Sequence, residues 1–201
     1  GGVVNVITRS GTNVFHGSLF GYWRSPTLGS DWRQLQTPNG LVNTTAEETL
    51  DFGVSASGPL VRDRLFLFGA FNPQYSTRTL IAPDDVENYP LRALGEVDQD
   101  RRSLSYAAKL TWQATSNHRL DICVFGDPSR GEPGPQRAFA LKRPDEKAFS
   151  SLRYGGRNEA LRYNGVLSAS WLLEGVLGHA STFHEEQPNI DETVRADLTV
   201  W

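Results

Sequence analysis

The sequence lacks most of the features that assign a function quickly. Its 201 residues include no methionine and one cysteine, Cys123, so an internal disulfide is excluded. The formal net charge of −3 leaves no excess of basic residues, and we expect no nucleic-acid partner. No apolar run approaches the roughly 18 residues that a transmembrane helix needs. A soluble domain or a membrane β-barrel remains.

Motifs of common catalytic and cofactor sites are also missing. No serine stands in a G-x-S-x-G nucleophile elbow, and no glycine-rich loop has the strand–loop–helix context of a phosphate site. His179 and His184 precede an acidic segment, but on a strand their parities differ and they face apart, which disfavours a metal site. The acidic pairs Glu47–Glu48 and Asp84–Asp85 fall in predicted loops and are interpreted as solvated charge. We therefore expect no enzyme and no cofactor.

The first residues, Gly1 and Gly2, are followed by no charged segment leading into an apolar one, so no signal peptide is predicted. Together with the missing methionine, this indicates a piece of a longer chain. The absence of a targeting signal then carries no information about location.

Alternation of apolar and small polar residues dominates what is present. Between residues 102 and 112, Leu104, Tyr106, Ala108, Leu110 and Trp112 share one parity. Successive strand side chains point to opposite faces, so this pattern predicts a strand with one apolar and one polar face. Strands of about 8 to 12 residues, close to what a tilted membrane-crossing strand needs, are predicted at 1–9, 14–23, 50–57, 65–71, 102–112, 119–126, 161–171, 176–184 and 193–201.

The connections alternate in length. Long ones are predicted at 25–48, 73–101 and 127–160, and short ones at 58–64, 114–118 and 172–175. A soluble sandwich has no reason to gather its long loops at one end, whereas outer-membrane barrels have short periplasmic turns and long extracellular loops. The predicted fold is all-β: an antiparallel up-and-down meander, part of a large outer-membrane β-barrel, present here as an open curved sheet or partial barrel.

Aromatic residues agree with this interpretation. Trp112 and Trp171 precede predicted short turns, while Trp23 and Tyr75 stand at the entrances to predicted long loops. Barrels carry aromatic girdles at both membrane interfaces. The alternative is the general preference of Trp and Tyr for strands.

Two stretches, GGVVNVITRSGTNVFHGSLF and FGVSASGPLVRDRLFLFGAFN, carry a family resemblance. They resemble TonB-dependent outer-membrane receptors, in particular the Oar-like branch, and cover about a fifth of the chain. The family signature G-G-P-[IL]-x-[KR]-D-[KR] is matched from Ser57 onward, with Ser57 in place of the first glycine. The signature turn, a structural feature, maps onto Gly58, Pro59, Arg62, Asp63 and Arg64.

The resemblance implies a barrel of roughly 22 strands with a plugged lumen. Residues 1–12 would end the plug domain, and residues 13–201 would supply the first seven or eight strands. The implied activity is TonB-energised uptake of a scarce, bulky solute across the outer membrane of a Gram-negative-type bacterium. The implied partners are the inner-membrane TonB complex, acting through an upstream plug region, the outer-membrane lipid and an unidentified imported solute.

Five polar strand residues are candidates for contact with that solute in the lumen, and each fits an inter-strand or plug-facing polar network equally well. They are Lys109, Arg119, Asp121, Arg162 and Asn164. A plug filling the lumen would also explain why Leu65–Phe71 is apolar on both parities. Two other functions stay open: a passive or structural outer-membrane β-barrel of the porin or adhesin kind, and a secreted soluble β-sandwich that binds glycans or carries an enzyme.

Overall fold

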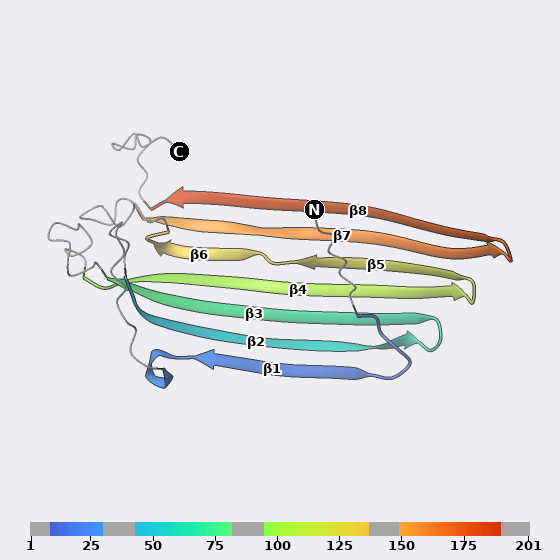
Figure 1. Cartoon of the computed structure of the whole chain (residues 1–201), viewed down its shortest axis with the longest axis horizontal. Helices are drawn as coiled ribbons and strands as arrows, with labels where there is room; N and C mark the ends of the chain where they lie inside the picture. Colours follow the sequence, from blue (N-terminus) through green and yellow to red (C-terminus); the bar gives the residue numbers. More distant parts are fainter. Residues whose placement is uncertain (1–8, 30–42, 82–94, 137–148, 190–201) are drawn as a thin grey trace.

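The computed structural model describes residues 9–29, 43–81, 95–136 and 149–189, without the side chains of Asn43 and Thr45. These residues form one antiparallel sheet in which strands adjacent in sequence lie side by side, apart from one pair that lies end to end (Figure 1). A short 3-10 helix, η1 (Pro26–Leu28), follows the first strand. The strands are β1 (His16–Arg24), β2 (Asn43–Val61), β3 (Leu65–Ile81), β4 (Val97–Thr115), β5 (His118–Gly126), β6 (Ser129–Gly134), β7 (Ser150–Ser168) and β8 (Trp171–Pro188).

β5 and β6 occupy the place of one strand between β4 and β7 (Figure 1). The register with β4 is the same on both sides of the gap, since Tyr106 pairs with Gly126 and Ser103 with Ser129. Pro128 interrupts the ladder because proline has no N–H to donate. The sheet is therefore a simple up-and-down meander, as predicted. Within the described residues β1 pairs only with β2 and β8 only with β7, so the sheet is open.

The registers align the apolar residues of successive strands on one face, which we call the apolar face. One row across it, from β3 to β8, consists of Leu67, Leu110, Ile122, Leu161 and Leu177. Leu19 is 81% exposed and Leu177 70% exposed, and no described segment forms a second layer over these side chains. Exposed apolar surface of this extent marks contact with a membrane or another protein.

Successive hairpins are staggered. β4 continues three residues beyond the Leu65–Trp112 pair to reach Thr115, and β7 continues three residues beyond the His118–Gly165 pair to reach Ser168. The short turns at the right of Figure 1 accordingly step outward from β2–β3 to β7–β8. Strands that close into a barrel must tilt and stagger in this manner.

Most strands are longer than the sequence predicted. β2, β4 and β7 each have 19 residues, so the predicted strand length of 8 to 12 is wrong for them, whereas β1 and β5 match it with nine residues each. The predicted long connections at 25–48, 73–101 and 127–160 are too wide for the same reason, because strand residues occupy their ends. Alternation stops where the apolar face ends, but backbone pairing continues with polar residues on both faces. Glu47 and Glu48 thus belong to β2 and not to a loop.

Two predicted breaks are also wrong. Gly58 and Pro59 lie inside β2, paired with Leu67 and Phe66. Proline fits there because β1 pairs with β2 only as far as Ser57, which leaves the last residues of β2 at an edge. The turn before β8 is at residues 169–170 and not at 172–175. The β2–β3 turn lies at residues 62–64, inside the predicted connection 58–64.

The four aromatic residues of the predicted girdles share the apolar face. Trp23 and Tyr75 both face Leu50 near the long-connection end of the strands. Trp112 and Trp171 lie near the short turns and are 49% and 71% exposed. None of the described residues forms a helix with the length and hydrophobicity needed to cross a membrane. The predicted strands at 1–9, with the exception of Arg9, and at 193–201, together with Asp84–Asp85, lie outside the described residues.

The side chain of Asn72 replaces a backbone hydrogen bond that is missing from the ladder between β2 and β3. The register is the same on both sides of Pro73, but Pro73 has no N–H for its partner strand. The Asn72 side chain donates instead to the Phe52 carbonyl oxygen at 2.8 Å and to Asp51 Oδ1 at 2.6 Å. A central strand thereby accommodates a proline.

Replacing Asn72 with leucine should therefore lower the free energy of unfolding of the sheet by about 1–2 kcal/mol, because two hydrogen bonds are lost. Urea unfolding of the full-length protein in lipid vesicles, followed by tryptophan fluorescence, measures this change. Ser105→Ala is the matched control, because Ser105 faces Asn72 from β4. Equal midpoints for the two variants would contradict the assigned role of Asn72.

Candidate functional site

The N-terminal segment before β1 lies on the polar face of the sheet at Ser10 and Gly11. A Cβ atom on Gly11 would approach the Leu67 carbonyl oxygen to 2.7 Å, the Gly58 carbonyl oxygen to 2.9 Å and Phe66 Cβ to 3.0 Å. Real side chains do not tolerate such distances to backbone atoms, so only glycine fits here. Gly11 is buried, and the segment is held directly against β2 and β3.

Asn13 fastens this segment to the β2–β3 turn by a reciprocal pair of hydrogen bonds. Asn13 Nδ2 donates to Asp63 Oδ1 at 2.5 Å, and the Asp63 backbone N–H donates to Asn13 Oδ1 at 2.8 Å. Asp63 has a φ of 62°, the left-handed conformation that aspartate adopts more readily than most residues. The turn thus presents its side chain and its N–H to one partner.

Phe15 completes the contact on the other side of the β2 edge. Its ring lies against Gly58, where a Cβ atom would overlap the aromatic carbons. Gly58 is paired with Leu67 and so has the parity of the apolar face. We call the contacts of Gly11, Asn13 and Phe15 with Gly58 and Asp63 the junction. It joins the two stretches that carry the family resemblance.

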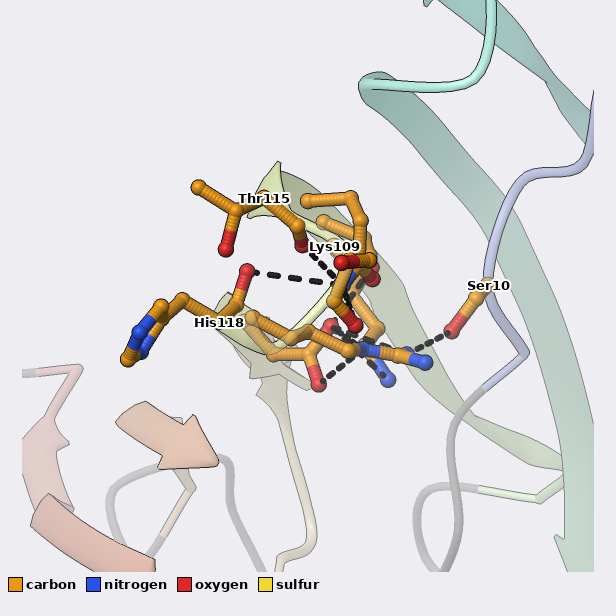
Figure 2. A network of polar contacts seen from close by, with 9 residues as sticks. Ser10, Lys109, Thr115 and His118 are labelled. Carbon is orange, nitrogen blue, oxygen red and sulfur yellow. Dashed lines mark hydrogen bonds and ion pairs between the residues drawn. The ribbon is translucent and has the colours of Figure 1, made fainter. Parts of the chain in front are cut away.

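A charged cluster on β4 and β5 adjoins the same segment. Asp121 accepts hydrogen bonds from Thr111 Oγ1 at 2.6 Å and from Arg119 Nε at 3.1 Å, and Lys109 Nζ lies 3.8 Å from its Oδ1. Asp121 is 5% exposed and Lys109 9%. Arg119 Nη2 also donates to Ser10 Oγ at 3.4 Å, which ties the cluster to the N-terminal segment (Figure 2).

The cluster stands close to a short turn. Gln113 Nε2 donates to the Thr115 carbonyl oxygen at 2.7 Å and, at longer range, to the His118 carbonyl oxygen, and so closes the β4–β5 hairpin. The fixed hairpin places Arg119 and Asp121 at the start of β5. The polar side chains therefore gather at the end of the sheet where the N-terminal segment arrives.

All five predicted lumenal residues lie on this polar face. Lys109, Arg119 and Asp121 form the cluster, while Arg162 faces Asp121 and Asn164 faces Arg119 from β7. Within the described residues, no hydrogen bond or ion pair joins Arg162 or Asn164 to the cluster. Arg162 is exposed, in contrast to Lys109 and Asp121.

The N-terminal segment also explains why residues Leu65–Phe71 are apolar on both faces of the strand. Leu67 and Phe71 lie on the apolar face and are 42% and 44% exposed. Phe66 lies on the polar face, where Gly11 of the N-terminal segment is adjacent to it. Phe66, an apolar residue on the polar face of β3, thus lies against the chain's own N-terminal segment.

The two histidines face apart, as their parity predicts. His179 lies near Glu159, with Nδ1 3.8 Å from Oε2, and His184 makes a tilted ring contact with Tyr154 on the opposite face. Among the described residues, no group of three or more potential metal ligands comes together.

Sequence reasoning missed the contacts of Ser10 and Asn13 and the reason for Gly11 and Gly58. Ser10 is 109 residues from its partner Arg119, and Asn13 is 50 residues from Asp63. No periodicity connects positions so far apart. The available signal was that the two most specific stretches of the chain both contain glycines and polar turn residues.

Comparison with known proteins agrees with the geometry. Residues 7–88 match the family model described as outer membrane beta barrel domain. The chain is 27% identical over 220 aligned positions to the TonB-dependent transporter Oar of Myxococcus xanthus, and the match covers 92% of this chain and 20% of that protein. The chain thus spans about a fifth of the length of this curated relative. No solved structure matches the chain at comparable significance.

These findings confirm the predicted resemblance, the all-β barrel fold and the location in an outer membrane. The apolar face is the surface that such a barrel turns to lipid, and the polar face is its lumenal side. The similar protein is a transporter, which fits the expectation of a transport function and not a catalytic one.

Proposed function

We propose, from the premise that this chain forms the wall of an outer-membrane β-barrel similar to the TonB-dependent transporters, that it serves TonB-energised uptake of a bulky solute. In this proposal residues before Asn13 end a plug domain that fills the lumen. The inner-membrane TonB complex pulls on that plug from the periplasmic side and opens a path. No bond of the solute is made or broken.

The observation that carries the proposal is the attachment of the N-terminal segment to the lumenal face. Gly11 is packed against β2 and β3, and Ser10 is hydrogen-bonded to Arg119. A passive porin has no need for a preceding segment fixed inside its wall. A plug that is pulled by force needs a fixed point where it joins the barrel, and the junction supplies one.

The cluster and the β7 residues take different parts in this proposal. Lys109 and Asp121 are buried and paired with each other, so they hold β4 and β5 together, and Asp121 also binds Arg119, the residue that donates to Ser10 of the N-terminal segment. Arg162 is exposed on the lumenal face, and with Asn164 it is the better candidate for contact with a passing solute. Both stay predictions.

Growth on limiting nutrients tests the function. A strain without the gene is compared with the wild type on defined media in which a ferric siderophore, cobalamin, an oligosaccharide or a peptide is the limiting nutrient. We expect slow growth on one of them, restored by the full-length gene. The same defect should follow from loss of the TonB protein. Uptake that persists without TonB would identify a passive barrel instead.

A further inference from the structure

Three arginines lie side by side on the same side of the sheet as the apolar face, in the row next to Leu104, the last apolar residue of that face on β4. Arg102 of β4 pairs with Arg130 of β6, and Arg130 pairs with Arg153 of β7. We call these residues the arginine row. All three are exposed. Side chains directly opposite on neighbouring antiparallel strands share a face, so three positive charges project together from the wall.

The row stands at the depth of lipid headgroups. On β4 the lipid-facing residues run from Trp112 to Leu104, and Arg102 is the next residue of that parity. Two residues along a strand are about 6.6 Å, or about 5 Å of depth for a tilted strand. The headgroup layer extends about 5–7 Å beyond the hydrocarbon. Tyr75, an aromatic of the interface, faces Arg102 from β3 at the same level.

Nothing in the described part of the chain neutralises the row fully. Arg130 Nε is 3.3 Å from Glu132 and Arg153 Nη1 is 3.7 Å from Glu185, but the four side chains are 45% to 64% exposed and such pairs are weak. Arg102 has no ion-pair partner among the described residues.

Nearby acidic groups do not cancel this arrangement. Asp100 and Glu132 lie one row farther from the lipid, and Asp100 accepts a hydrogen bond from Thr77 at 2.6 Å. Arg157 and Glu159 lie nearer the membrane centre and pair with each other at 2.5 Å. Like charges that face each other across strands destabilise a sheet. An anion that spans such a row reduces the repulsion between its charges.

We propose that the arginine row binds the phosphate groups of an anionic lipid headgroup in the leaflet on the long-connection side. Guanidinium groups form bidentate hydrogen bonds with phosphate oxygens, which ammonium groups do not. Neighbouring strands are about 4.8 Å apart, so the row extends about 10 Å and reaches more than one phosphate group. The proposal depends on the outer-membrane location and not on the transported solute.

Lipid retention by the full-length protein tests the proposal. The purified protein is reconstituted in phosphatidylcholine vesicles with and without lipid A, which carries phosphate groups, and bound lipid A is measured by native mass spectrometry after extraction. Each of Arg102→Gln, Arg130→Gln and Arg153→Gln should weaken retention by about fivefold, and the triple variant should abolish it. Arg102→Gln breaks no ion pair seen in the structure, so folding is preserved in at least this variant.

Arg78→Gln is the matched control. Arg78 is exposed on β3 near the same end of the sheet but has the parity of the lumenal face. Its loss changes the net charge equally and should leave lipid A retention unchanged. Equal loss in Arg78→Gln, wild-type retention in the triple variant, or complete displacement by millimolar inorganic phosphate would each overturn the proposal, since each removes the specific role of a lipid headgroup at the row.

Discussion

Replacing Asp121 with leucine should lower the free energy of unfolding of the full-length protein by about 3–5 kcal/mol. The substitution leaves Lys109, which is 9% exposed, without its counter-charge and frees the Thr111 hydroxyl. Removing one partner of a buried pair costs more than the pair contributes, because the remaining charge stays away from water. Urea unfolding in lipid vesicles, followed by tryptophan fluorescence, measures the loss.

The double variant Lys109→Met, Asp121→Leu is the control that isolates the charge. It removes both buried charges and keeps the volume, so most of the stability should return. Arg119 keeps contact with water because its side chain is 40% exposed. A double variant that is as unstable as Asp121→Leu alone would show that the shape of the site matters and that the ion pair does not.

Replacing Gly11 with valine should detach the N-terminal segment from the lumenal face. The new side chain would meet the backbone oxygens of Gly58 and Leu67, which cannot rotate away. Overpacking of this kind costs about 1–3 kcal/mol, and the hydrogen bonds between Asn13 and Asp63 would be lost with it. Trypsin cleavage after Arg9, followed in outer-membrane vesicles, should become faster.

Gly69→Ala is the control for this substitution. Gly69 lies on β3, close to the Gly11 contact, but a Cβ atom there meets no other atom within 4 Å. The alanine variant should show the cleavage rate of the wild type. If Gly11→Val is cleaved no faster than Gly69→Ala, the segment is not held by the packing described. If uptake also falls in Gly11→Val, the junction serves transport as well as stability.

The arrangement of the sheet followed from the sequence because it depends on local patterns. Alternation predicted which residues of 102–112 share a face, and the contrast of short and long connections predicted a meander. The lengths of the strands could not be predicted from these patterns. Thr77 pairs with Asp100 and Thr79 with Asp98, polar on polar, and such pairs leave no alternation to detect even though the backbone ladder continues.

The candidate site could be predicted from the sequence only in part, for a related reason. Lys109, Arg119 and Asp121 were recognised as polar residues of one face because parity alone decides the face. Their mutual contact, their burial and the attachment of Ser10 depend on register between strands and on a segment 109 residues distant. Register is set by turn positions and hydrogen bonds that sequence patterns do not specify to the residue.

The sequence by itself determined that this chain is an antiparallel wall with one lipid-facing side, because side chains on a strand alternate with a period of two. It also determined the resemblance to a transporter family, through two stretches of specific residues. Only the tertiary structure decided that these two stretches touch, that Gly11 and Gly58 must lack side chains, and that three arginines form a row across β4, β6 and β7. Each of those facts depends on which residues lie opposite one another across strands, and only the folded sheet fixes that.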